Sequence, residues 1–149
     1  MWMVTMRIAE ILNTKGSAVA TVRPETDIRA LLALLAEQNI GAAVVSPDGN
    51  RIAGIVSERD VVRGLHRYGA SLLEFPVTRI MTTEVRTCSP DDRVDGLRGI
   101  MTDHRVRHLP VVDQGRLTGI VSIGDVVKSA LSELTTEREQ LVGYLQGGY

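Results

Sequence analysis

The sequence predicts an α/β (α+β) fold in which two β-α-β-β-α repeats pack against each other as an intramolecular pair, with a helical extension at the C-terminus. The first observation behind this prediction is a repeated motif, Gly-Ile-Val-Ser-x-x-Asp, which occupies residues 54–60 and returns at residues 119–125. An internal repeat sets the architecture before any local signal does. The second observation is size, because a unit of about 60 residues buries only about 60% of its unfolded surface and needs a neighbour.

Each copy of the motif has the pattern of a strand that turns sharply into a helix. The apolar run Gly-Ile-Val is typical of a buried strand, and Ser followed three residues later by Asp is typical of a helix N-terminus. The remaining elements are placed around these two turns. Repeat 1 is expected over residues 7–68 and repeat 2 over residues 77–134, and the tail covers residues 135–149.

The elements of repeat 1 follow from apolar spacing and from turn and capping residues. Residues Pro24–Asp27 start a helix, and Ile28, Leu31, Leu32 and Leu35 give it one buried face. We expect a helical turn at 7–12, strands at 17–22, 40–46 and 51–56, a turn at 47–50, and a helix from Ser57 to about Tyr68.

The elements of repeat 2 parallel those of repeat 1, after a linker over residues 69–76. Residues 79–82 correspond to residues 10–13, and Pro90 with its neighbouring acids starts a helix. We expect strands at Val85–Cys88, His108–Val112 and Leu117–Val121, a turn at 113–116, a helix with the buried face Val94, Leu97, Ile100 and Met101, and a last core helix from Ser122 to about Leu134. The tail is expected to be helical. It is either a solvated terminal helix or a contact between the subunits of a dimer, and the sequence does not distinguish the two.

Composition excludes several classes of function. The net charge of −1 and an aromatic content of 3% argue against a nucleic-acid binder that works through bulk positive charge or stacking. Cys88 is the single cysteine, so no intrachain disulfide is expected and a reducing, cytoplasmic location fits. No apolar run approaches the roughly 18 residues of a membrane span, and the three histidines lack metal-ligand spacing.

The chemistry-bearing residues are the hydroxyl and the carboxylate of each turn. Taken singly, a Ser-x-x-Asp turn is more often a helix cap than a binding site. The same atoms also suit a nucleotide: Ser57 and Ser122 lie at helix N-termini, which favour phosphate, and the carboxylates of Asp60 and Asp125 accept hydrogen bonds from ribose hydroxyls. Ile55 and Ile120, at the strand ends, are placed to face an apolar ring.

On these residues the chain resembles a pair of CBS domains, a Bateman module, over about residues 7–134. The segment His108-Leu109-Pro110-Val111-Val112-Asp113 is also similar to the family's second strand. The resemblance implies a non-catalytic sensor that binds AMP, ADP or ATP, with NAD(H) or S-adenosylmethionine as further candidates, in clefts between the repeats, and that forms a homodimer. It implies a ligand-binding set made of Ser57, Arg59, Asp60, Ile55, Ser122, Asp125, Ile120, Thr82, Thr87, Arg107, His108, Pro110, Lys15 and Thr21.

The two copies differ, so we expect two unequal sites. Repeat 1 carries Arg59 where repeat 2 carries Gly124, and only the arginine offers a fork of donors to phosphate. Repeat 2 carries Arg105 and Arg107 where repeat 1 has no basic residue. A dimeric scaffold that binds no nucleotide is the alternative function. An enzyme is disfavoured for lack of an activated nucleophile or a metal cluster, and any regulated protein is unidentified.

Overall fold

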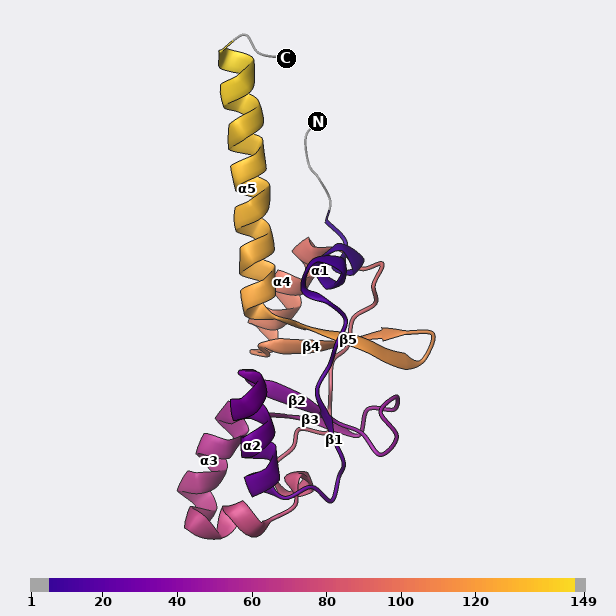
Figure 1. Ribbon diagram of the computed structural model, residues 1–149, viewed down its shortest axis with the longest axis vertical. Helices are drawn as coiled ribbons and strands as arrows, with labels where there is room; N and C mark the ends of the chain where they lie inside the picture. The colour runs from indigo at the N-terminus through magenta and orange to yellow at the C-terminus, as the bar shows by residue number, and fades with distance from the viewer. Residues whose placement is uncertain (1–5, 147–149) are drawn as a thin grey trace. The chain divides into compact units, whose positions relative to one another are not determined.

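The computed structural model describes residues 6–146 and has the mixed α/β content that the sequence predicts (Figure 1). Its residues form two compact units that divide the chain differently from the sequence repeats. The sheet unit, as we name it, comprises Ser17–Cys88 and Leu109–Ile120; the helical unit comprises the chain up to Gly16, Ser89–His108 and the chain from Val121. The elements are α1 (Ile8–Lys15), β1 (Thr21–Val22), α2 (Ile28–Gln38), β2 (Ala42–Val45), β3 (Gly54–Ser57), α3 (Glu58–Tyr68), η1 (Gly69–Glu74), η2 (Val77–Arg79), α4 (Val94–Asp103), β4 (His108–Asp113), β5 (Arg116–Ser122) and α5 (Ile123–Leu145).

The sheet unit is built on a three-stranded sheet in the order β1-β2-β3. β1 pairs parallel to β2 and β2 pairs antiparallel to β3, with Val44 opposite Ile55. All four residues of β2 are buried, as expected for a central strand. Each strand has fewer residues than the corresponding predicted range, 17–22, 40–46 or 51–56, and pairing in β1 begins only at Thr21.

Helix α2 confirms the capping signals in the sequence. The Asp27 carboxylate accepts a hydrogen bond from the Ala30 amide at 2.8 Å, which satisfies one of the free N–H groups of the first turn. Asn39 closes the helix in the left-handed conformation with φ of 52°. Ile28, Leu31 and Leu35 are buried between these caps, so α2 supplies one wall of the core.

The segment predicted to be a linker is structured instead. Residues Gly69–Glu74 form the 3-10 helix η1, and Leu72 is fully buried in the core of the sheet unit. A side chain at Gly64 of α3 would meet Leu72 at 2.9 Å, so α3 and η1 pack closely at this glycine. The linker is therefore an ordered segment, because one buried leucine holds it against α3.

The β4–β5 hairpin is confirmed, but the predicted first strand of repeat 2 is not. Gln114 and Gly115 both have positive φ, as a two-residue hairpin turn requires. Of the predicted strand Val85–Cys88, only Cys88 pairs, as an isolated parallel bridge to Val111. The Val85 amide donates to the Thr83 carbonyl, so the chain turns where an extended strand was expected.

The helical unit contains α1, α4 and α5. Backbone hydrogen bonds from Ile8 to Asp92 and from Val94 to Met6 fix the start of α1 beside the start of α4. α1 is longer than the predicted turn at 7–12. Along α4, Val94, Leu97 and Met101 are buried as predicted, but Ile100 is 37% exposed, so its place in the buried face was wrong.

Helix α5 joins two predicted pieces into one. The core helix expected from Ser122 to about Leu134 and the helical tail form a single helix of 23 residues that ends at Leu145 (Figure 1). The predicted tail also includes residues 147–149, which lie outside the described residues. Within residues 6–146, no helix has the length and apolar character needed to cross a membrane.

Candidate functional site

The first Ser-x-x-Asp turn joins β3 to α3 and forms a reciprocal capping box. The Ser57 hydroxyl accepts from the Asp60 amide at 3.4 Å. In return, Asp60 Oδ2 accepts from the Ser57 amide at 2.8 Å and from the Ser57 hydroxyl at 3.1 Å. Both residues are half-buried, and every hydrogen bond that the Asp60 carboxylate accepts within the described chain falls on this one oxygen. The other oxygen of Asp60 retains its acceptor capacity.

The second turn joins β5 to α5 and has the same backbone geometry. The Ser122 hydroxyl accepts from the Asp125 amide at 3.2 Å, and Asp125 Oδ2 accepts from the Ser122 amide at 2.9 Å. A third partner distinguishes it, because the ammonium of Lys15 donates to Asp125 Oδ2 at 2.6 Å. Lys15 is the last residue of α1, so an element outside the motif places a positive charge on this carboxylate.

The environment of Asp125 shifts its acidity. Burial raises the pKa of the carboxyl, but the hydrogen bonds from Lys15 and Ser122 and the charge of Lys15 outweigh burial and hold the pKa below its ordinary value. The side chains of Lys15 and Asp125 are 30% and 23% exposed, so solvent screens the pair in part. Asp125 is therefore a stable carboxylate near neutral pH.

A close backbone approach brings two further predicted residues together beside the first turn. Ile55 and Thr82 exchange both backbone hydrogen bonds, each at 2.9 Å. Gly54 permits this pairing, because a Cβ there would lie 2.8 Å from the Thr82 carbonyl oxygen and 2.7 Å from Met81 Sδ. The glycine of the repeated motif thus has a steric role in repeat 1, because it allows Thr82 to pair with Ile55.

The other predicted residues are distributed over both units. Thr21, Arg59, Thr87 and Arg107 are exposed; Ile120 and His108 are half-buried; Pro110 is buried in β4. The Pro110 carbonyl accepts from the Cys88 amide at 3.0 Å and the Arg107 carbonyl accepts from the Ile123 amide at 2.8 Å, so both have backbone roles. The structure brings together Lys15, Ser122 and Asp125 in the helical unit and Ile55, Ser57, Asp60 and Thr82 in the sheet unit.

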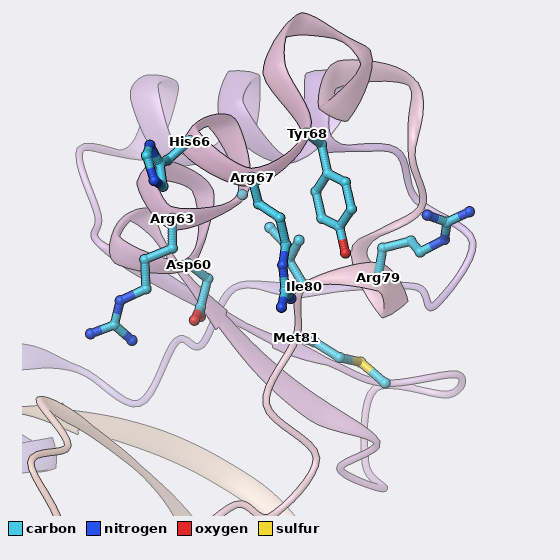
Figure 2. Close-up of a pocket in the computed structure, with 9 residues that line it drawn as sticks. Asp60, Arg63, His66, Arg67, Tyr68, Arg79, Ile80 and Met81 are labelled. Carbon is cyan, nitrogen blue, oxygen red and sulfur yellow. The ribbon is translucent and has the colours of Figure 1, made fainter.

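A cavity of about 580 Å³ in the sheet unit was not predicted from the sequence. We name it the arginine cavity; its lining residues are Asp60, Arg63, Gly64, His66, Arg67, Tyr68, Arg79, Ile80 and Met81. Figure 2 shows the Arg67 side chain directed from α3 toward Ile80, with Asp60 on one side and Tyr68 on the other. Arg63 and Arg67 follow Asp60 along α3, whereas Arg79, Ile80 and Met81 come from η2 and the residues after it, so no pattern along the sequence indicated this site. Across residues 6–146, no group of three or more His, Cys, Asp or Glu side chains is placed to hold a metal ion.

Comparison with known proteins identifies the repeats. The family described as "CBS domain" matches residues 8–67 and again residues 77–132. The mitochondrial CBS domain-containing protein CBSX3 of Arabidopsis thaliana is 40% identical over 150 residues, which covers 95% of this chain and 73% of that protein.

Solved structures agree with this assignment. The CBS-domain protein ATU1752 of Agrobacterium tumefaciens is 40% identical with a TM-score of 0.81, over 84% of this chain and 99% of that one. The CBS domain protein PAE2072 of Pyrobaculum aerophilum, solved in complex with AMP, is 29% identical with a TM-score of 0.75, over 88% and 99% of the two chains.

Proposed function

The chain belongs to the CBS-domain family as a tandem pair, and from that premise we propose that it is a non-catalytic regulatory module that binds adenine nucleotides. AMP and ATP are the first candidate ligands, and ADP and NAD(H) follow. The observation that carries the proposal is the Ser57–Asp60 turn, whose carboxylate keeps one oxygen free of hydrogen bonds within the described chain. The AMP complex of the Pyrobaculum relative supports the choice of ligand class.

The first turn offers complementary groups to a ribose phosphate. A carboxylate is a pure acceptor, so the free oxygen of Asp60 suits the donor hydroxyls of ribose. The amides at the start of α3 and the positive end of its dipole favour a phosphate near Ser57. Ile55 and Thr82, paired beside this turn, would face the base.

We assign the second turn the same role with a weaker intrinsic affinity. A ribose at Asp125 has to compete with the Lys15 ammonium for the carboxylate. The free energy needed to displace Lys15 is small, because partly exposed ion pairs contribute about 0–1 kcal/mol. A ligand that gives its phosphate to Lys15 would remove even this cost, so the second site favours a phosphorylated adenosine. In this proposal Ile120 and Pro110 contact the ring, Thr21 and Thr87 lie around the base, and Arg59, Arg107 and His108 contact phosphate.

Ligand binding is tested most directly by thermal melting and calorimetry with AMP, ADP, ATP, NAD, NADH and S-adenosylmethionine. A free ligand at 100 times its dissociation constant should stabilise the fold by about 2.7 kcal/mol. We expect a shift with at least one adenine nucleotide. A shift with S-adenosylmethionine alone would reassign the module as a sensor of that compound, and no shift with any ligand would leave the scaffold as the function. Turnover of ATP or NAD would contradict a non-catalytic role.

We further propose that α5 forms a homodimer contact. Val127, Leu131, Leu134, Leu141 and Leu145 are between 50% and 76% exposed. Together with Arg138 they follow the alternating spacing of four and three residues that is typical of a coiled-coil seam. A two-fold dimer requires a self-complementary surface, and this seam is self-complementary when two copies run antiparallel.

The antiparallel arrangement is favoured by charge. In a parallel pair, Arg138 would face Arg138 of the partner subunit in the same layer, which is repulsive. In the antiparallel register, Arg138 faces the partner subunit's Leu134, and Leu131 faces the partner subunit's Leu141. We propose a second copy of this chain as the occupant of the exposed seam.

Sedimentation and cysteine cross-linking test the dimer. The double variant Leu134→Glu/Leu141→Glu should sediment as a monomer, while Ser132→Glu, an exposed change outside the seam, should remain dimeric. Cys88 is buried, so introduced cysteines are the accessible thiols in the described chain. Mixing Leu131→Cys with Leu141→Cys should give a cross-linked pair, and self-cross-linking of Leu131→Cys alone would indicate a parallel pair. A monomeric wild type would overturn the contact. We propose that the unidentified regulated protein binds this dimer. We place this interaction in the cytoplasm and expect no nucleic acid to take part in it.

A further inference from the structure

The arginine cavity has an excess of positive charge that its own unit does not neutralise. Arg63, Arg67 and Arg79 line it with one carboxylate, that of Asp60. None of the three arginines forms an ion pair within residues 6–146. Other arginines of the same unit do find carboxylates, as Arg29 pairs with Glu74 at 2.9 Å.

A second cavity of about 580 Å³, in the helical unit, is a useful contrast. It is lined by Arg7 and Arg93, but also by Asp91, Asp92 and Asp95. There the three acidic side chains outnumber the two basic ones. The arginine cavity is the one of these two that is electrostatically suited to an anion.

Aromatic contacts hold two of the arginines in place. The Arg67 guanidinium lies 5.9 Å from the centre of the Tyr68 ring, and the Arg79 guanidinium lies 4.4 Å from the centre of the Phe75 ring. The two rings meet edge to face with centroids 5.3 Å apart. Cation–π contacts of this kind orient a guanidinium without using its hydrogen-bond donors. The donors of Arg67 and Arg79 stay available for a ligand.

Helix electrostatics account for only part of this cluster. Arg67 lies in the last turn of α3, where a cation complements the helix dipole. Arg79 belongs to η2, and its contact with Phe75 brings it to the same cavity from a different element. Figure 2 shows Arg63 and Arg79 at opposite edges of the group, with Arg67 between them. The Arg67 guanidinium lies at the centre of the group, and the Arg63 and Arg79 side chains extend outward from its two edges, so Arg67 is the principal donor for an anion in this cavity.

We propose that the arginine cavity binds a diphosphate group. Guanidinium forks match phosphate oxygens with two parallel hydrogen bonds, and Tyr68 adds a hydroxyl donor at the wall. The volume lies within the range of about 300–1,000 Å³ that is usual for small-molecule sites. Inorganic pyrophosphate and the terminal phosphates of a nucleotide share this chemistry. The assignment does not rest on nucleotide binding at the Ser57 turn.

Calorimetry with inorganic pyrophosphate at constant ionic strength tests the site. We expect wild-type protein to bind it, Arg67→Gln to bind at least ten-fold more weakly, and Arg67→Lys to fall between the two because it keeps the charge but loses the fork. Arg116→Gln is the matched control, since Arg116 is exposed in the same unit and forms no ion pair within the described chain. That control should bind within two-fold of wild type. Equal binding by wild type and Arg67→Gln, or an equal loss in Arg116→Gln, would overturn the proposal.

The source of the diphosphate is resolved by comparing AMP with ATP. If the cavity receives a nucleotide tail, Arg79→Gln should weaken ATP and leave AMP unchanged. If it receives a free anion, pyrophosphate should bind in the presence of saturating AMP and ATP should not displace it. Melting temperatures of all variants confirm that the fold is intact. If the protein binds pyrophosphate but no adenosine ligand, only the proposed nucleotide function is refuted. If it binds an adenosine ligand but no pyrophosphate, only the diphosphate site is refuted.

Discussion

The turns Ser57–Asp60 and Ser122–Asp125 share a sequence pattern and a backbone geometry, yet they present different carboxylates. In both, the serine hydroxyl accepts from the aspartate amide and the aspartate accepts from the serine amide. Only Asp125 also accepts from Lys15. The four-residue pattern is sufficient to form the helix cap, because all the hydrogen-bond partners in the cap lie within that pattern. The charge around the aspartate depends instead on residues that are distant in the sequence, such as Lys15.

The difference gives a physical basis for unequal sites. The sequence predicts inequality from Arg59, Arg105 and Arg107, whose side chains are exposed. The structure adds one further difference between the turns, the Lys15 ammonium at Asp125. A ligand that binds the Asp125 carboxylate has to displace the Lys15 ammonium, whereas a ligand that binds the Asp60 carboxylate displaces no side chain of the described chain. We therefore expect different binding free energies at the two turns.

Removing each carboxylate should have the largest effect and separates the two turns. We expect Asp60→Ala to weaken nucleotide binding by about 1.5–3 kcal/mol, the contribution of hydrogen bonds to a charged group. Asp125→Ala should cost less, because its ligand gains only after displacing Lys15. Calorimetry with AMP and ATP measures both, and Asp113→Ala, at an exposed hairpin position, is the control. Equal losses in Asp60→Ala and Asp125→Ala would remove the distinction between the turns, and normal binding by both would refute the ribose assignment.

Gly54→Ala should distort the first turn from the strand side. The new Cβ would meet the Thr82 carbonyl, a backbone atom that cannot rotate away, at 2.8 Å. Overpacking of this kind costs about 1–3 kcal/mol of unfolding free energy, which urea titration measures. Gly96→Ala is the control, because a Cβ there meets nothing within 4 Å and lies in helix α4, where alanine is favoured. A neutral Gly54→Ala would show that the Ile55–Thr82 pairing is adaptable.

Removing each hydroxyl tests whether the two caps are equivalent. Ser57→Ala and Ser122→Ala should each lower the unfolding free energy by about 1 kcal/mol, the usual contribution of an N-cap side chain. Ser71→Ala, an exposed serine of η1, should change it little. Urea titration measures both changes in unfolding free energy. Clearly different values for Ser57→Ala and Ser122→Ala would show that the two caps contribute unequally to stability despite their shared geometry.

The local elements were predictable from the sequence because their causes are local. Asp27, Ser57 and Ser122 cap helices as their patterns predict, and the hairpin turn lies where the sequence places it. Val85–Cys88 was mispredicted because β-branched residues favour a strand only when a partner strand is available, and only Cys88 finds one. The ordered conformation of the linker was not predictable from the sequence, because the burial of Leu72 depends on the packing of α3.

The candidate site shows the same division. The repeated motif identified both aspartates and both serines, which interact over three residues. The ion pair between Lys15 and Asp125 spans 110 residues of sequence, so no pattern along the chain announces it. The arginine cavity likewise depends on Arg67 and Arg79 reaching one place from two elements. Contacts of this range require the tertiary structure.

The smallest expected effect is the change in stability that comes from the Lys15–Asp125 ion pair, and acid titration tests it. The folded-state pKa of Asp125 lies below its ordinary value, so the pair stabilises the fold fully above the unfolded pKa of about 3.9. This stabilisation is lost as the pH falls through the lower folded pKa. Lys15→Met should therefore be less stable than wild type by up to about 1 kcal/mol at pH 7, and the two should converge in strong acid.

Unfolding free energies between neutral and acid pH measure this convergence. Lys128→Met is the matched control, because Lys128 is exposed on α5 and forms no ion pair within the described residues. Its difference from wild type should not depend on pH in the same range. Parallel curves for Lys15→Met and wild type would show that Lys15 leaves the acidity of Asp125 unchanged. The two turns would then differ in geometry alone, and the Lys15 basis for unequal sites would fail.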